Sequence, residues 1–277
     1  PVLIGIPGEV LALPGVAFLT SVKQGNSADL GTRVAVIGGG NTAIDAARTA
    51  KRLGVKEVNI IYRRTRNEMP ASSEEIDGAL EEGVKIEYLT SPARISGTAG
   101  KLKLQCIKMS LGEPDASGRR QPNPVKGSEF TESYTAIISA TGQQSALLNV
   151  KIDARTTRTQ RAGVFAGGDA ASGPATVIEA IASGSRAARE IDDYLGTAEA
   201  GIEGENQPLL RFNNDYLNKT ERVSTSDVPV SKRSLDNEDR TYLEANGVEH
   251  EANRCFNCGC VSVNASDLST ALSVMDA

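Results

Sequence analysis

The sequence predicts an α/β fold built on a doubly wound parallel sheet, and three observations lead to that prediction. A short run of apolar, mostly β-branched residues at 34–37 has the character of a strand that is buried on both faces. A glycine-rich turn and a helical pattern of alanines through 43–53 follow it directly. A second β-branched run at 58–62 completes a strand–helix–strand unit, whose right-handed crossover makes the two strands parallel.

Each further element has a sequence signal of its own. A helix that begins near Ser72 or Ser73 has two glutamates in its first turn, which favour a helix N-terminus, and Gly83 ends it. Residues 101–106 alternate polar with apolar and predict a strand with one face toward solvent, whereas residues 112–128 are rich in turn-forming types and predict a hairpin loop. The other predicted strands lie at 84–89, 135–140 and 163–166, and the other predicted helices at 16–22 and 175–195.

Composition excludes several classes of function. The 277 residues include 30 Lys and Arg against 35 Asp and Glu, a net charge of −5, which argues against a nucleic-acid or anionic-membrane partner. No apolar stretch approaches the roughly 20 residues that a bilayer-spanning helix needs. The chain has a single histidine, His250, so a Ser–His–Asp triad or a site with several histidine ligands is not expected.

The glycine-rich turn carries the strongest local signal, Gly38-x-Gly40-x-x-Ala43, between a strand and a helix. In such a motif the first glycine permits the tight turn, the second lets the backbone approach a pyrophosphate, and the small third residue permits close helix–strand contact. The helix N-terminus adds a partial positive charge. We predict a Rossmann-like dinucleotide site that includes Gly39, Asn41 and Thr42; the alternative is a purely structural turn.

The end of the next strand indicates which dinucleotide is bound. A site for NAD usually places an acidic residue there for the ribose 2′-hydroxyl. This chain has Arg63, Arg64 and Arg66 instead. Guanidinium groups match a 2′-phosphate through forked hydrogen bonds, and Arg64 could also stack on the adenine. We predict a preference for NADPH; the alternatives are a solvated charge cluster and a preference for NADH.

Several motifs occur in the order found in one known family. They are Gly-Ile-Pro-Gly-Glu9, Val-Ile-Gly-Gly-Gly-Asn-Thr-Ala-Ile-Asp45, Tyr-Arg-Arg64, Glu68-Met-Pro-Ala71, Ala-Thr-Gly142 and Gly-Val-Phe-Ala-Gly-Gly-Asp169. Together they resemble the glutamate synthase small (β) subunit-like branch of the pyridine nucleotide–disulfide oxidoreductase superfamily. The resemblance is strong over about residues 1–200 and looser in the tail.

The resemblance implies an electron-input flavoenzyme. NADPH would give a hydride to FAD, and electrons would pass onward to an iron–sulfur cluster or to a redox partner subunit or domain. Hydride transfer needs orientation and no acid–base side chain, so no catalytic residue is assigned. Gly142 would lie near the cofactors where the chain crosses back. Gly168, Asp169, Ala175 and Thr176 would contact the flavin, and the protein would be cytoplasmic.

The same resemblance implies how the chain is divided. Residues 1–31 would connect from an FAD domain, 32–140 would form the NADPH-binding domain, 141–197 would complete the FAD domain, and 198–277 would be a tail. Full family members begin with iron–sulfur ligands and a first glycine motif for the ADP part of FAD, and neither precedes Pro1. We therefore expect a piece of a longer protein that keeps NADPH recognition and binds FAD weakly or not at all. The alternative is a non-catalytic NADP(H)-binding module, or a segment that docks a larger redox complex.

Three of the four cysteines lie together near the C-terminus, at Cys255, Cys258 and Cys260. Three thiolates are one ligand short of an iron–sulfur cubane set, and His250 would complete a Cys3His zinc set at an unusual spacing. The three cysteines could instead include a Cys258–Cys260 redox pair, or they could be reduced thiols that bind nothing. Cys106 stands alone in the predicted NADPH domain, which excludes a dithiol there and favours a core position.

Overall fold

A computed structural model describes eight stretches of the chain. These are residues 2–26, 29–115, 118–143, 151–153, 155–173, 175–196, 221–237 and 239–253. The chain divides into two compact units, Pro1–Thr197 and Ala198–Ala277.

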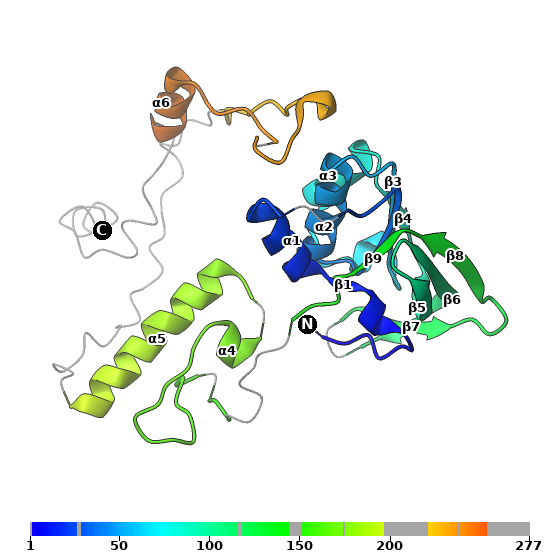
Figure 1. Ribbon diagram of the computed structural model, residues 1–277. Coiled ribbons are helices and arrows are strands. Elements are labelled where there is room, and N and C mark those ends of the chain that lie inside the picture. Colours follow the sequence, from blue (N-terminus) through cyan, green and yellow to red (C-terminus); the bar gives the residue numbers. More distant parts are fainter. Residues whose placement is uncertain are drawn as a thin grey trace. The chain divides into compact units, whose positions relative to one another are not determined.

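The first unit is built on a five-stranded sheet in the order β1-β9-β2-β3-β4 (Figure 1). All neighbouring strands in it are parallel. Its strands are β1 (Leu13–Pro14), β2 (Arg33–Ile37), β3 (Glu57–Ile61), β4 (Lys85–Glu87) and β9 (Ala136–Ser139). The α/β class and the parallel Rossmann-like sheet that the sequence predicts are thereby confirmed.

Helices cover one face of this sheet. They are α1 (Gly15–Lys23), α2 (Asn41–Arg52) and α3 (Ser73–Glu81), with short 3₁₀ turns at Glu9–Leu11 and Arg66–Glu68. Alternate strand residues such as Val36 and Ile60 join Ile44 and Ile76 of the helices in one buried cluster. Phe18 of α1 belongs to the same cluster, and β1 pairs with β9 at the edge of the sheet. Both α1 and β1 lie in residues 1–31, the segment expected from the sequence to connect from an FAD domain.

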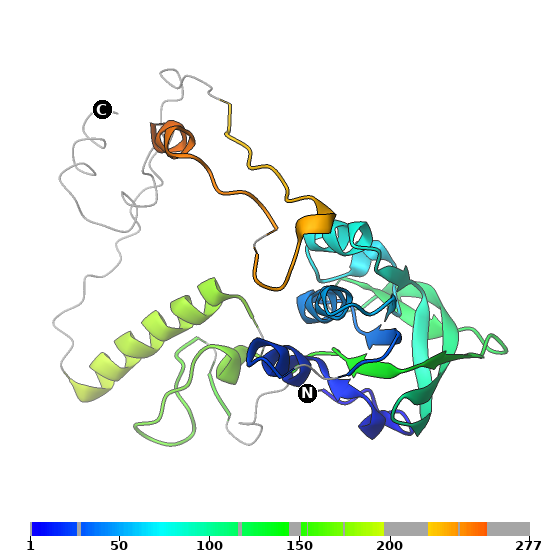
Figure 2. The ribbon, with the colours of Figure 1, turned by 45° about the horizontal axis from the view of Figure 1, so that its top comes forward.

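An antiparallel sheet covers the other face (Figures 1 and 2). It contains β5 (Thr90–Thr98), β6 (Lys101–Pro114), β7 (Arg120–Pro124) and β8 (Phe130–Tyr134). The remaining strand residues of the parallel sheet, including Ile37 and Ile137, pack against Leu104 and Cys106 of β6. The alternating burial predicted for residues 101–106 is confirmed, because Leu102, Leu104 and Cys106 are the buried positions.

Two predictions about the chain's secondary structure are wrong in detail. The predicted hairpin loop at 112–128 contains the end of β6 and all of β7, which pair antiparallel from Met109↔Pro124 to Pro114↔Arg120. The predicted strand at 163–166 makes one isolated bridge, Arg158↔Phe165, instead of a strand. β7 is a strand because it pairs with the end of β6 in the same hairpin, whereas the pairing of Phe165 is limited to one bridge. Local composition does not distinguish these two cases.

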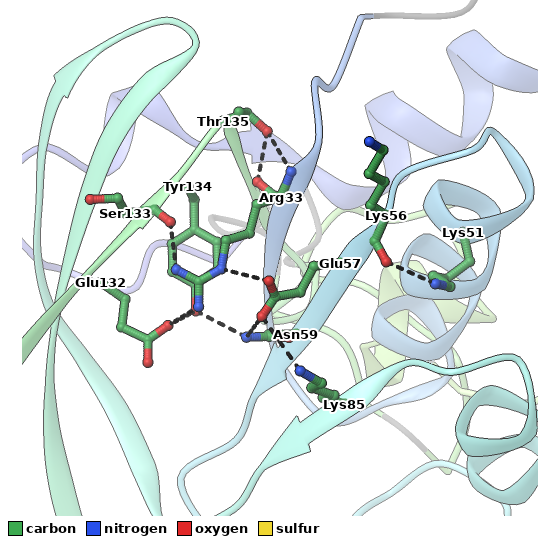
Figure 3. A network of polar contacts seen from close by, with 10 residues as sticks. All are labelled: Arg33, Lys51, Lys56, Glu57, Asn59, Lys85, Glu132, Ser133, Tyr134 and Thr135. Atoms are coloured by element: carbon green, nitrogen blue, oxygen red, sulfur yellow. Dashed lines mark hydrogen bonds and ion pairs between the residues drawn. The ribbon is translucent and has the colours of Figure 1, made fainter.

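A polar network joins the two sheets at the end opposite the glycine turn (Figure 3). The guanidinium of Arg33 on β2 donates to Glu132 at 2.6 Å and to the Ser133 carbonyl at 2.8 Å, and its Nε lies 3.2 Å from a Glu57 carboxylate oxygen. The same guanidinium stacks over the Tyr134 ring at 4.6 Å. Charge pairing and stacking therefore fix β8 against β2 and β3.

Two further helices lie in residues 155–196, namely α4 (Asp169–Ser172) and α5 (Val177–Leu195). Thr176 caps α5 in a reciprocal capping box with Glu179, as expected from a Thr-x-x-Glu sequence. Phe165 packs edge-on against Tyr194 with ring centres 5.8 Å apart, which holds the preceding loop to α5. The helix predicted at 175–195 is confirmed.

In the second unit the described elements are a 3₁₀ turn at Val230–Lys232 and helix α6 (Ala245–Asn253). A single antiparallel bridge joins Asp227 to Arg240. Across the residues that the structure describes, no helix is long and apolar enough to cross a membrane.

Candidate functional site

A cavity of about 430 Å³ lies at the carboxyl ends of β2, β3 and β9. This is the edge of an open parallel sheet at which ligands bind in α/β proteins. Its lining comes from several parts of the first unit: the N-terminal lead-in, the glycine turn, the end of β3 with the segment after it, the start of β5, the β6–β7 hairpin and the segment after β9. The lining residues include Val2, Ile4, Gly38, Gly39, Gly40, Thr42, Tyr62, Arg63, Arg64, Pro70, Pro92, Arg119, Thr141 and Gly142.

The three adjacent glycines of the turn differ in what surrounds them. Gly38 has φ +145°, and a Cβ there would lie 2.3 Å from the Ala140 carbonyl oxygen. A Cβ on Gly39 would lie 2.4 Å from the Tyr62 ring. Gly40 has an extended backbone with φ −91°, and a Cβ there would meet no atom within 4 Å. Packing within the protein therefore requires the first two glycines, whereas the third leaves open space beside the helix end.

Helix α2 begins directly at this space. Gly40 is its N-cap and has no side chain to offer, so no side-chain cap bonds to the first amides. Thr42 lines the cavity, Asn41 is exposed outside the lining, and Ala43 is fully buried, with its Cβ 3.3 Å from the position a Cβ of Gly38 would take. An uncapped helix N-terminus beside open space is suited to a phosphate group.

Tyr62 and the Glu68-Met-Pro-Ala71 segment hold the turn in place. The Tyr62 hydroxyl donates to the Glu68 carbonyl at 2.6 Å, and the Ala71 amide donates to the Gly39 carbonyl at 3.3 Å. Burial raises the pKa of Tyr62, so its hydroxyl stays protonated and keeps this bond at neutral pH. The Glu68 carboxylate in turn accepts from the Thr65 amide at 3.1 Å.

The arginines predicted for the 2′-phosphate occupy three different environments. Arg63 is exposed and lines the cavity. Arg64 also lines it but is only 4% exposed, because its Nε donates to the Arg120 carbonyl at 2.7 Å and its Nη2 to Asp115 at 2.8 Å. Arg66 pairs with Asp77 at 2.7 Å and is not part of the lining.

Arg119 is a lining residue that sequence reasoning missed. It lies on the β6–β7 hairpin, far along the chain from the glycine turn. The available signal was the Arg119-Arg120 pair within a turn-rich segment, but only the pairing of β6 with β7 brings it to the end of β3.

Gly142 lies where two connecting segments of the chain run together. The Val2 amide donates to the Gly142 carbonyl at 2.9 Å, and the Thr141 hydroxyl donates to the Val2 carbonyl at 2.8 Å. Gly142 has φ +109°, a conformation that favours glycine. Gly142 thus lines the same cavity as the glycine turn.

The four residues predicted to contact flavin lie together in a second place. Gly168 has φ +61° and donates its amide to Ser183 at 3.0 Å. The Asp169 carboxylate accepts the Ala175 amide at 3.3 Å, and Thr176 begins α5. A carboxylate beside a helix N-terminus fits the ribityl and phosphate chemistry of a flavin nucleotide.

The cysteine predictions concern two regions. Cys106 is buried in the second core cluster, and burial raises the pKa of its thiol to about 12, as expected for an inert core position. Cys255, Cys258 and Cys260 lie outside the described residues. Within the described stretches, no group of three or more Cys, His, Asp or Glu side chains is arranged to hold a metal ion.

The chain is similar in sequence to subunits of several NADP(H)-dependent enzymes. The chain is 44% identical to the NADP(+)-dependent formate dehydrogenase subunit beta of Moorella thermoacetica, over 70% of this chain and 30% of that protein. It is 36% identical to the NADPH-Fe(3+) oxidoreductase subunit beta of Geobacter sulfurreducens, over 91% of this chain and 45% of that protein. It is 35% identical to the glutamate synthase [NADPH] small chain of Azospirillum brasilense, over 65% of this chain and 41% of that protein.

These figures mean that the chain spans less than half the length of each of the three relatives. Among solved structures, Mycobacterium tuberculosis FprA in complex with NADPH has a similar fold, with a TM-score of 0.59, 18% identity, and 73% of this chain and 63% of that chain covered. The sequence profile described as pyridine nucleotide-disulphide oxidoreductase matches residues 1–184. The chain therefore belongs to the pyridine nucleotide-disulphide oxidoreductase family.

Proposed function

We infer that this chain is the NADPH-binding part of an oxidoreductase that takes a hydride from NADPH and delivers electrons to a partner subunit or domain in the cytoplasm. The observation that carries this proposal is the open space at Gly40, between the uncapped N-terminus of α2 and a cluster of guanidinium groups. It offers a pyrophosphate a helix dipole on one side and offers a 2′-phosphate positive charge on the other.

The chain's own residues would bind and orient the cofactor. The turn at Gly38, Gly39 and Gly40, with Asn41 and Thr42, would hold the pyrophosphate against the first turn of α2, and Arg63 would contact the 2′-phosphate. Residues 2–4 of the lead-in and Gly142 also line the cavity, and they would shield part of the bound cofactor from water.

FAD, when bound, would supply the hydride acceptor, and Gly168, Asp169, Ala175 and Thr176 are the residues of this chain that would contact it. No proton needs to move for hydride transfer to begin, so the proposal assigns no acid or base among the described residues. The relatives carry names of three different enzymes, an NADP(+)-dependent formate dehydrogenase, an NADPH-Fe(3+) oxidoreductase and a glutamate synthase [NADPH]. We propose a redox partner subunit without assigning its substrate.

The test is calorimetric titration of the full chain with NADPH, NADH and FAD, after an absorbance spectrum of the purified protein. We expect NADPH to bind at least tenfold more tightly than NADH. Arg63→Ala should weaken NADPH binding about tenfold or more and change NADH binding by less than twofold, because one charge-assisted hydrogen bond contributes about 1.5–3 kcal/mol.

The matched control is Lys126→Ala, which removes one positive charge from an exposed position outside the cavity. It should leave both dissociation constants within twofold of the wild-type values. Equal affinity of the wild type for NADPH and NADH would contradict the 2′-phosphate assignment. A flavin spectrum that NADPH bleaches would show that the chain transfers hydride by itself; NADPH binding without flavin would support an NADP(H)-binding module.

A further inference from the structure

We propose that Arg119 on the β6–β7 hairpin is a specificity-determining residue for the 2′-phosphate, and that Arg64 is the positioning residue that holds this hairpin beside the cavity. The proposal rests on the proposed NADPH site and refines which side chains distinguish NADPH from NADH.

Arg119 lines the same cavity as Arg63. Both line it together with Tyr62, whose ring lies against the glycine turn. Burial raises the pKa of Tyr62, and the positive charges of Arg64, Arg119 and Arg63 each act against that rise. The two exposed ones, Arg63 and Arg119, come from segments separated by more than fifty positions in the sequence.

Asp115 connects the hairpin to Arg64. One carboxylate oxygen accepts the Arg119 amide at 3.3 Å, and the other accepts Nη2 of Arg64 at 2.8 Å. The Asp115 amide donates to the Arg119 carbonyl at 2.7 Å and closes the turn. Nε of Arg64 binds the next carbonyl, that of Arg120, also at 2.7 Å. Arg64 is only 4% exposed and its guanidinium is engaged at Nε and Nη2, so it fixes the hairpin and has little surface left for a ligand.

The charges at this end of the cavity match the ligand. Asp115 is paired with Arg64, and Arg63 and Arg119 each add a positive charge to the lining. A phosphate monoester carries about −1.5 to −2 at neutral pH. Two forked guanidinium groups from different segments can satisfy its oxygens, which a ribose 2′-hydroxyl does not require.

The experiment uses two adenosine probes with the full chain, 2′,5′-ADP and 5′-AMP, because they differ only in the 2′-phosphate. Arg119→Ala should weaken 2′,5′-ADP binding about tenfold and leave 5′-AMP binding within twofold. Arg119→Lys keeps the charge but loses the fork, and we expect an intermediate loss. Lys126→Ala is again the charge control and should change neither dissociation constant by more than twofold.

Asp115→Asn tests whether the hairpin must be held in place, because a charge effect and a positioning effect would change the dissociation constant of 2′,5′-ADP in opposite directions. It removes a negative charge near the phosphate, so charge alone would make 2′,5′-ADP bind more tightly. If Asp115 positions the hairpin for Arg119, the substitution should weaken 2′,5′-ADP binding about three- to tenfold instead. Circular dichroism and melting temperature of each variant establish that the domain is folded.

Each outcome has one meaning. A wild type that binds 2′,5′-ADP no more tightly than 5′-AMP overturns the proposed function itself. A wild-type preference that Arg63→Ala removes and that both Arg119 variants retain overturns only the role of Arg119. Tighter 2′,5′-ADP binding by Asp115→Asn overturns the positioning role, because it would mean that Arg64 is released to bind the phosphate directly.

Discussion

Of the three glycines in the turn, Gly40 is the one that packing within the protein does not require. Its neighbours Gly38 and Gly39 are fixed by the Ala140 carbonyl and the Tyr62 ring, so substitutions there would disturb packing. Gly40 has an ordinary φ and open space where a side chain would stand. A glycine that neither sterics nor conformation explains is best explained by the close approach of another molecule.

Gly40→Ala should therefore weaken cofactor binding without unfolding the protein. We expect the melting temperature to change by less than about 2 °C, since the added methyl group meets no protein atom. The NADPH dissociation constant should rise more than tenfold, because the methyl group occupies the space proposed for the pyrophosphate. Gly184→Ala is the matched control, since a Cβ at that position in α5 also meets nothing within 4 Å. Unchanged NADPH affinity in Gly40→Ala would remove the pyrophosphate from this turn.

At the same scale, the sequence predicts some site residues better than others. The glycine motif is contiguous, so its spacing alone brings Gly38, Gly40 and Ala43 into one turn. Arg63 and Arg64 are adjacent in sequence, yet one is exposed at the cavity and the other is buried against the hairpin. That difference depends on Asp115, which is about fifty residues away, and no local pattern contains it.

Helices α2 and α3 are joined by a buried group of charges. Arg48 and Arg52 on α2 both donate to Glu82 at the C-terminal end of α3, at 2.6 and 2.7 Å from Oε1, and the Glu82 side chain is 5% exposed. Burial alone would raise the pKa of this carboxyl, but the hydrogen bonds and charges of Arg52 and Arg48 outweigh it and hold the pKa below its usual value.

Glu82→Gln should destabilise the protein in a pH-dependent way. The folded-state pKa of Glu82 is lowered, so its stabilisation is present above the unfolded value of 4.5 and is lost as the pH falls through the folded pKa. At pH 7 we expect the free energy of unfolding to fall by about 2–3 kcal/mol. Chemical denaturation at pH 7 and pH 4 measures the difference, which should shrink at the lower pH. Glu129→Gln, at an exposed position, should change stability little at either pH; a Glu82 effect that is independent of pH would argue against an ionised carboxylate.

The sequence predicts the strands of the parallel sheet better than those of the antiparallel sheet. The buried runs of β2, β3 and β9 are predicted because both faces of each strand are apolar. β5 and β7 contain Pro92, Pro122 and Pro124 and have no clear alternation. β7 is a strand because β6 extends beyond β8 and provides a partner, and proline is tolerated at such an edge. The strands β5 and β7 therefore depend on pairing with β6, which cannot be predicted from their own composition.

In the first unit, the parallel sheet lies between a layer of helices and an antiparallel sheet, and the cavity lies at the carboxyl ends of its strands. The helices on one face of the parallel sheet supply the N-terminus of α2, and the antiparallel sheet on the other face supplies the β6–β7 hairpin. Both layers contribute to the cavity at the carboxyl ends of β2, β3 and β9. Binding there should therefore stabilise the whole unit, because it connects elements that are distant in sequence.

Thermal unfolding in the presence of cofactor tests this directly. At a concentration of one hundred times its dissociation constant, NADPH should add about 2.7 kcal/mol to the stability of the folded state. For a unit of this size that corresponds to a rise in melting temperature of about 5–10 °C. NADH at the same concentration, if it binds tenfold more weakly, should add about 1.4 kcal/mol. The Gly40→Ala protein is the control: because its dissociation constant should rise more than tenfold, the same NADPH concentration should add less than about 1.4 kcal/mol to its stability. Equal rises with NADPH and NADH would show that the guanidinium groups of this edge do not read the 2′-phosphate.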